Sequence, residues 1–132
     1  MLRLLMIVSG GVEAAFGASA LIVPDVVIGV LLGTEASASA VALARLLGAA
    51  TLALGVAALL ARDALRTEGG LAASYGLALY NVLAACLILW TASVAGLGGA
   101  ALWGAGLFHA AMGVLFVYAL ATLATSRNTS RS

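Results

Sequence analysis

The 132-residue chain is 64% hydrophobic and only 8% charged, and its mean hydropathy is +1.21. Soluble domains carry about 25% charged and about 45–50% apolar residues, so this chain lacks the polar surface that a water-soluble monomer needs. The same composition excludes a disordered chain, because disordered segments are polar and rich in charge. We therefore expect an integral membrane protein that has the lipid bilayer as its solvent.

Residue types that carry chemistry are scarce. Cys86 is the one cysteine and His109 the one histidine, so the chain by itself can form no intrachain disulfide, cysteine zinc site or two-histidine metal or haem site. The sequence contains no GxSxG, CxxC, HExxH or phosphate-loop motif. We predict no catalytic residue and no metal site, and we expect a protein that is not an enzyme by itself. The net charge of +1 argues against a nucleic-acid partner, and Cys86 is expected to be a small apolar core residue.

The first apolar segment, residues 4–23, has two interpretations. The arginine at position 3 and the small-residue run Ala18-Ser19-Ala20 are typical of a signal peptide and its cleavage site. However, Glu13 lies in the middle of the segment, where signal peptides rarely carry a carboxylate, and the apolar run continues to Val23. These two features favour a first transmembrane helix.

Four segments have the roughly 20 apolar residues that a helix needs to cross a hydrocarbon core of about 30 Å. They are residues 4–23, 38–61, 71–90 and 100–123. The apolar stretch 26–33 is too short to span; an interfacial segment fits it best, with a re-entrant turn or an extension of the second helix as alternatives. Residues 125–132 form a polar tail. The sequence thus predicts an all-α protein, a single domain over residues 1–132, built as a four-helix transmembrane bundle.

The charged residues outside these segments predict the orientation. On one side of the bilayer the connecting segments carry two acidic residues, Asp25 and Glu35, and no basic residue. Five arginines lie on the other side: Arg3, Arg62, Arg66, Arg127 and Arg131. By the positive-inside rule, both termini are expected to be cytoplasmic, and we expect a multi-pass protein of the inner (plasma) membrane. Trp90 and Trp103 fall near the outer ends of their helices and are expected to be interfacial anchors.

A weak internal repeat relates residues 10–25 to residues 48–63. The two stretches align without gaps and share two glycines, three other apolar residues and a final aspartate. Because the chain is so rich in alanine, glycine and leucine, we attribute much of this match to chance.

Five polar side chains in or beside the predicted spans are the candidate site: Glu13, Arg45, Tyr80, Asn81 and His109. An ionisable residue near the bilayer centre costs at least about 2.5–3.5 kcal/mol, so it needs a partner or water. Small residues flank four of the candidates at helical spacing, which predicts that these face the bundle interior: Glu13, Arg45, Asn81 and His109. Tyr80 is included as the neighbour of Asn81. A helical rise of about 1.5 Å per residue places Glu13 level with Asn81, and Arg45 level with His109 nearer the outer leaflet. The alternatives are a ligand pocket or proton-handling site, and a polar core that fixes helix register.

The chain resembles the small four-helix bacterial membrane proteins of the broad DoxX-like group. The resemblance lies in the runs GGVEAAFGASALIVPD, LLGTEAS and ARLLGAATLALGVAALLARD, in the YN pair of the third helix, and in the one histidine of the fourth. It implies a compact four-helix bundle. Some members are membrane subunits of quinone-linked oxidoreductases, and distant ones bind sterols or other lipids through a buried acid, for which Glu13 is the candidate here.

These observations predict a small, non-catalytic membrane protein. It would bind a hydrophobic molecule (lipid, quinone or sterol-like) around the candidate site, or serve as an accessory subunit of a larger membrane complex. One alternative is a transporter or channel formed by homo-oligomerisation, and another is a membrane subunit of a quinone- or haem-linked oxidoreductase. The cofactor is left open, with a bound lipid or quinone as the candidates.

Overall fold

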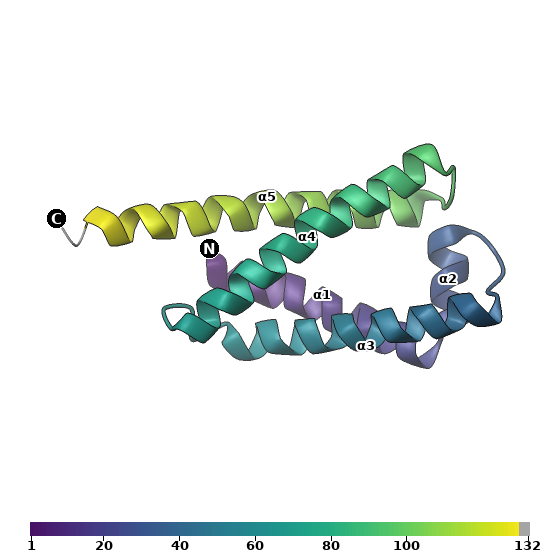
Figure 1. Ribbon diagram of the computed structural model, residues 1–132, viewed down its shortest axis with the longest axis horizontal. Helices are drawn as coiled ribbons and strands as arrows, with labels where there is room; N and C mark the ends of the chain where they lie inside the picture. Colours follow the sequence, from purple (N-terminus) through teal and green to yellow (C-terminus); the bar gives the residue numbers. More distant parts are fainter. Residues whose placement is uncertain (130–132) are drawn as a thin grey trace.

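The computed structural model describes residues 1–129, and these residues form helices and no β-strand. The helices are α1 (Leu2–Ile22), α2 (Pro24–Leu32), α3 (Ala38–Ala61), α4 (Glu68–Val94) and α5 (Ala100–Thr129) (Figure 1). Four of them, α1, α3, α4 and α5, are long and apolar enough to cross a membrane. The all-α class and the four long apolar helices predicted from the sequence are confirmed.

The helix ends follow from local chemistry. Ser37 and Thr67 begin α3 and α4 as N-caps, their side-chain oxygens accepting hydrogen bonds from Ala40 N (3.2 Å) and Gly70 N (3.1 Å). Pro24 begins α2, where a missing N–H costs nothing. The predicted short segment 26–33 is therefore a helix of its own that starts two residues earlier.

Two helices are longer than predicted. The third predicted segment ends at residue 90, whereas α4 continues to Val94, and the hydroxyls of Thr91 and Ser93 donate hydrogen bonds back to the carbonyls four residues earlier. The fourth predicted segment ends at residue 123, whereas α5 continues to Thr129 and includes the first part of the predicted polar tail. Residues 130–132 of that tail, which include Arg131, lie outside the described residues.

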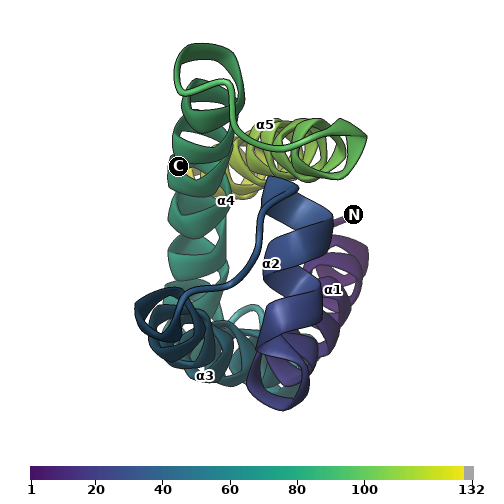
Figure 2. The same cartoon turned by 90° about the vertical axis from the view of Figure 1, so that its right-hand side faces the viewer.

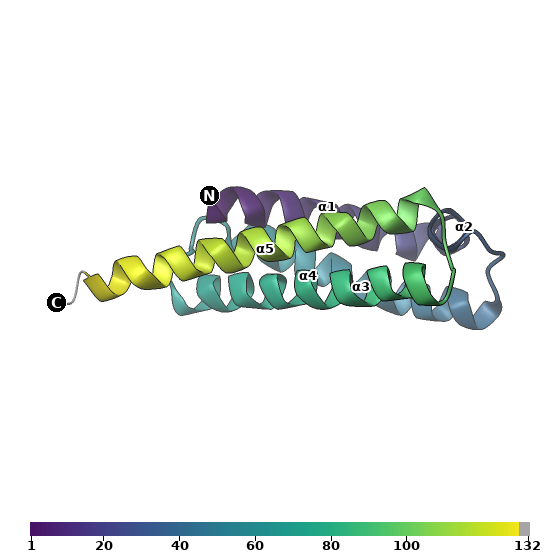
Figure 3. The same ribbon diagram turned by 90° about the horizontal axis from the view of Figure 1, so that it is seen from above.

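The long helices form two pairs, α1 with α3 and α4 with α5, which lie against each other in an elongated bundle (Figures 1 and 3). The short helix α2 lies across one end of this bundle, as the end-on view shows (Figure 2). It is attached there by a hydrogen bond from Gly98 N, in the α4–α5 loop, to Leu32 O (3.2 Å). At the opposite end, Arg3 Nε donates to Asp63 Oδ1 at 2.6 Å and joins the start of α1 to the α3–α4 loop.

Helices α1 and α3 approach so closely that their contact requires glycine. A Cβ on Gly17 would collide with Leu52 N and Gly48 O, and a Cβ on Gly55 would lie 2.5 Å from Gly10 O. Gly10 thus faces Gly55 while Gly17 faces Gly48, so the two helices run antiparallel. Small residues permit this kind of backbone approach in lipid. The shared glycines of the internal repeat are these four residues, and the repeat therefore has a structural role beyond a chance match.

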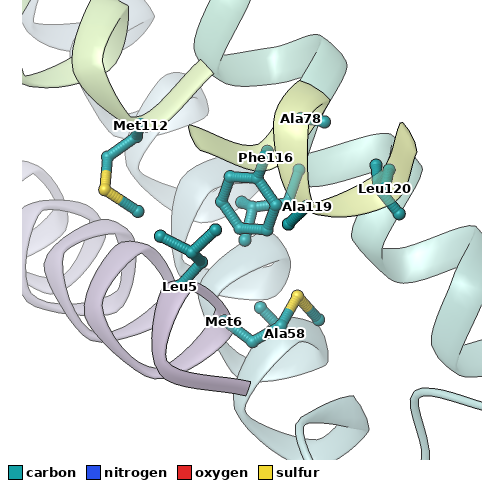
Figure 4. Close-up of a cluster of buried hydrophobic side chains, with 9 residues drawn as sticks. Leu5, Met6, Ala58, Ala78, Met112, Phe116, Ala119 and Leu120 are labelled. Atoms are coloured by element: carbon teal, nitrogen blue, oxygen red, sulfur yellow. The ribbon is translucent and has the colours of Figure 1, made fainter. Parts of the chain in front are cut away.

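Side chains from all four long helices form the apolar core near the end that carries Arg3. Phe116, Met6 and Leu77 are fully buried there, with Leu5 and Met112 beside them (Figure 4). The outer faces of the helices are just as apolar, because many large hydrophobic side chains are exposed. A bundle that is apolar inside and outside suits a lipid surrounding.

Cys86 corrects one prediction. The residue is exposed on α4 rather than in the core. The buried face of α4 carries Ala78, Asn81 and Ala85, and Cys86 follows this stripe by one residue, which rotates it out of the bundle. Trp90 and Trp103 are also exposed, and their role as interfacial anchors stays a prediction.

Candidate functional site

A polar cluster lies inside the bundle, between α1, α4 and α5. Its buried members are Ser9 and Glu13 of α1, Asn81 of α4 and His109 of α5, and none is more than 8% exposed. Ser9 and Glu13 are four residues apart, so they share one face of α1. Gly106 and Gly113 lie one turn before and one turn after His109, and they let Leu89 and Val82 of α4 pack closely against α5.

Asn81 connects the three helices. Its Nδ2 donates to Ser9 Oγ at 3.0 Å and to the backbone carbonyl of Leu77 at 2.8 Å. Its Oδ1 lies 3.0 Å from His109 Nδ1. Because an amide oxygen only accepts, His109 Nδ1 carries the hydrogen in this arrangement. The amide thereby fixes both the orientation and the tautomer of the imidazole.

Glu13 is the least satisfied member of the cluster. Its side chain is almost fully buried, and no described group forms a hydrogen bond with Oε1. His109 Nδ1 lies 3.8 Å from this atom, beyond hydrogen-bonding distance. Glu13 Oε1 is therefore left without a donor among the described groups. An unsatisfied buried acceptor costs about 1–3 kcal/mol, and more when it is charged.

Two aromatic rings flank the cluster. Tyr80 and Phe108 each make an edge contact with the His109 ring, with centroids 5.6 Å apart in both pairs. Both residues are only half-buried, so they are the members of the site that reach the bundle surface. The arrangement combines a buried acceptor without a donor, an imidazole of fixed orientation and two half-buried aromatic rings.

Arg45 does not belong to the cluster. Its side chain is exposed on the outside of α3, and no described side chain forms an ion pair or hydrogen bond with it. The buried face of α3 consists of Gly48, Thr51, Gly55 and Ala58. At about 100° per residue, Arg45 lies roughly a quarter turn from the centre of that face. The prediction that Arg45 faces the bundle interior is therefore wrong.

The predicted depth of His109 in the bilayer is also wrong. His109 was expected to lie level with Arg45, but its 3.0 Å contact with Asn81 places it on the level of Glu13. The structure thus brings four of the five predicted residues together: Glu13, Tyr80, Asn81 and His109. It adds Ser9 and Phe108, which the sequence analysis did not select. Ser9 could have been found, because it is the one polar residue a helical turn before Glu13.

The described residues contain no group of three or more histidine, cysteine, aspartate or glutamate side chains that could hold a metal ion. No family model, curated protein or solved structure matches this chain. The resemblance to the DoxX-like group stays a prediction, and the function is argued from the geometry of the site.

Proposed function

We propose that this protein is a non-catalytic membrane protein that binds a hydrophobic molecule, whose polar group sits at the Glu13 site. The observation that carries this proposal is the buried Glu13 Oε1, which has no donor among the described groups. Natural structures keep buried polar atoms paired, so an orphaned one calls for a specific explanation. A ligand that supplies the missing partner is such an explanation.

The chemistry of the orphaned atom narrows the ligand class. A carboxylate oxygen accepts hydrogen bonds, so the ligand must donate one. A sterol-like alcohol, a hydroxyl-bearing lipid or the reduced form of a quinone meets this requirement. A ligand that offers only carbonyl oxygens does not. The half-buried rings of Tyr80 and Phe108 provide the flat apolar contact that a ring system or acyl chain needs beside its polar group.

We place the chain in a bacterial plasma membrane with both termini in the cytoplasm. The Arg3–Asp63 contact supports this orientation, because it puts Arg3 at the same end of the bundle as the α3–α4 loop with Arg62 and Arg66. The opposite end carries Asp25 and Glu35 and no arginine in its loops. An excess of arginine is typical of cytoplasmic loops.

Matched ligand pairs test the proposal. The melting temperature of the purified protein is measured with cholesterol and with cholest-4-en-3-one, and again with ubiquinol and with ubiquinone. The hydroxyl member of at least one pair should raise the melting temperature more than its carbonyl partner. Glu13→Leu, which removes the acceptor, should abolish this difference. Equal effects within both pairs, or no effect of any of the four compounds, would count against a donor ligand at Glu13.

Arg45 favours a second candidate function, that of an accessory subunit in a larger membrane complex. An exposed arginine within a membrane-spanning helix is costly unless a lipid headgroup or a partner neutralises it. Photo-crosslinking in cells from the exposed neighbour Leu46, with exposed Leu107 on α5 as the control position, tests this candidate. A protein adduct of discrete mass that forms only at Leu46 and requires Arg45 is expected, and its absence would leave lipid as the cover of this face.

A further inference from the structure

A groove of about 420 Å³ lies at the arginine-bearing end of the bundle. Its walls come from the start of α1, the α3–α4 loop and the C-terminal half of α5, which meet near the N-terminus (Figures 1 and 3). It shares no residue with the Glu13 site.

The groove combines positive charge with an apolar wall. Arg3 and Arg66 contribute the charge, and none of the described residues that line the groove is acidic. Leu2, Leu65 and Leu123 contribute half-buried apolar surface beside them. Leu2 and Leu65 also pack against the core of the bundle, so this wall is backed by well-packed side chains.

The nearest acid is already engaged. One carboxylate oxygen of Asp63 accepts a hydrogen bond from Arg3 Nε at 2.6 Å, and the other oxygen lies 3.3 Å from Arg62 Nε. Arg62 in turn donates Nη1 to Leu59 O at 2.7 Å. The contact with Asp63 uses only Nε of Arg3, and the two terminal nitrogens hold four of the five guanidinium donors. Glu68, the other acid of this end, begins α4 and does not line the groove.

We propose that an anionic phospholipid binds in this groove, with its phosphate on Arg3 and Arg66 and an acyl chain along Leu2, Leu65 and Leu123. Guanidinium groups match phosphate oxygens in geometry and charge. Basic pockets between transmembrane helices at the cytoplasmic side are typical sites for anionic headgroups. The apolar wall favours a lipid over free phosphate, because inorganic phosphate would gain nothing from it.

Native mass spectrometry of the full-length protein tests this proposal. The delipidated protein is mixed with equal amounts of phosphatidylglycerol and phosphatidylcholine that carry the same acyl chains. Phosphatidylglycerol should be retained roughly tenfold more than phosphatidylcholine, as expected for two arginines beside an anionic headgroup. Arg66→Gln should reduce this preference strongly, and Arg66→Lys should reduce it less. Arg62→Gln, which removes a charge at the same end of the bundle that does not line the groove, should leave it unchanged.

Three outcomes would overturn the proposal. Equal retention of the two lipids by the wild-type protein would exclude a headgroup-specific site, and this outcome does not depend on the folding of any variant. An equal loss in Arg62→Gln and Arg66→Gln would show a general charge effect without a specific groove. Displacement of phosphatidylglycerol by millimolar inorganic phosphate would show that the groove is a phosphate site rather than a lipid site.

Discussion

His109 Nδ1 lies 3.0 Å from Asn81 Oδ1 but 3.8 Å from Glu13 Oε1, so the imidazole is held by the amide and not by the carboxylate. His109, the nearest possible ion-pair partner of Glu13, is thus already hydrogen-bonded to Asn81. A polar core that only fixes helix register would satisfy its own members. This one leaves an acceptor open, which is the reason to regard the cluster as a binding site.

Glu13→Leu separates binding from stability. The substitution replaces a buried carboxyl group that has an unpaired oxygen with an apolar side chain of similar size, so we expect unchanged or higher stability together with loss of the bound molecule. Unfolding in mixed micelles measures the first effect. A loss of about 1–3 kcal/mol, the usual cost of leaving a buried hydrogen-bonding group without its partner, would instead identify Glu13 as a structural residue.

Asn81→Leu should destabilise the bundle. The substitution removes the hydrogen bonds to Ser9 and Leu77 and leaves His109 Nδ1 without its acceptor, at an expected cost of about 1–3 kcal/mol. Thr51→Val is the control, because the Thr51 hydroxyl is equally buried but bonds only within its own helix, to Leu47 O and Gly48 O. If the two variants lose the same stability, Asn81 does not connect the helices as described.

Gly17→Ala should weaken the α1–α3 contact. The new methyl group would collide with the backbone of α3 at Gly48 and Leu52, and such overpacking costs about 1–3 kcal/mol. Gly11→Ala, in the same helix, meets nothing within 4 Å and should be neutral or stabilise the helix slightly. Thermal unfolding of both variants in one detergent measures the contrast. A neutral Gly17→Ala would contradict the close backbone approach.

Asp63 should make stability depend on pH in the acidic range. The hydrogen bond from Arg3 holds the pKa of Asp63 below its ordinary value. The contact therefore contributes stability at neutral pH that is lost as the pH falls below about 4, where the unfolded chain and then the folded chain take up the proton. Both side chains are exposed, so the effect is small and weakens with salt.

Melting temperatures of wild type and Asp63→Asn at pH 7 and pH 3 measure this contribution. At pH 7 the wild-type protein should have a higher melting temperature than Asp63→Asn, and this difference between the two proteins should be smaller at pH 3. A difference that is the same at both pH values would show that the charges of Arg3 and Asp63 do not contribute to the stability of the protein.

Length and hydropathy were enough to predict the four long helices, and the small residues around Glu13, Asn81 and His109 were enough to predict that these three face inward. The rotation of α3 could not be predicted in the same way. This helix is apolar on all sides, so hydrophobic periodicity does not indicate which side is buried. Gly48 lies on the buried face and Arg45, one turn earlier, does not.

The depth of His109 was mispredicted for a different reason. Its depth was counted from the predicted helix end at residue 123, whereas α5 continues to Thr129 and extends beyond the rest of the bundle (Figures 1 and 3). A count of residues from one end places a side chain correctly only if the helix is upright and its end lies at the membrane surface. Packing against α4 sets the level of His109, and sequence spacing carries no information about that packing.

The central claim is that Glu13 holds the polar group of a bound hydrophobic molecule. Native mass spectrometry of protein extracted under mild conditions tests it most directly, with wild type, Glu13→Leu and Thr51→Val prepared in parallel. We predict an added mass of one small hydrophobic molecule on the wild-type protein and on Thr51→Val, and its absence from Glu13→Leu. Identical spectra for the wild-type protein and a folded Glu13→Leu variant would contradict the claim.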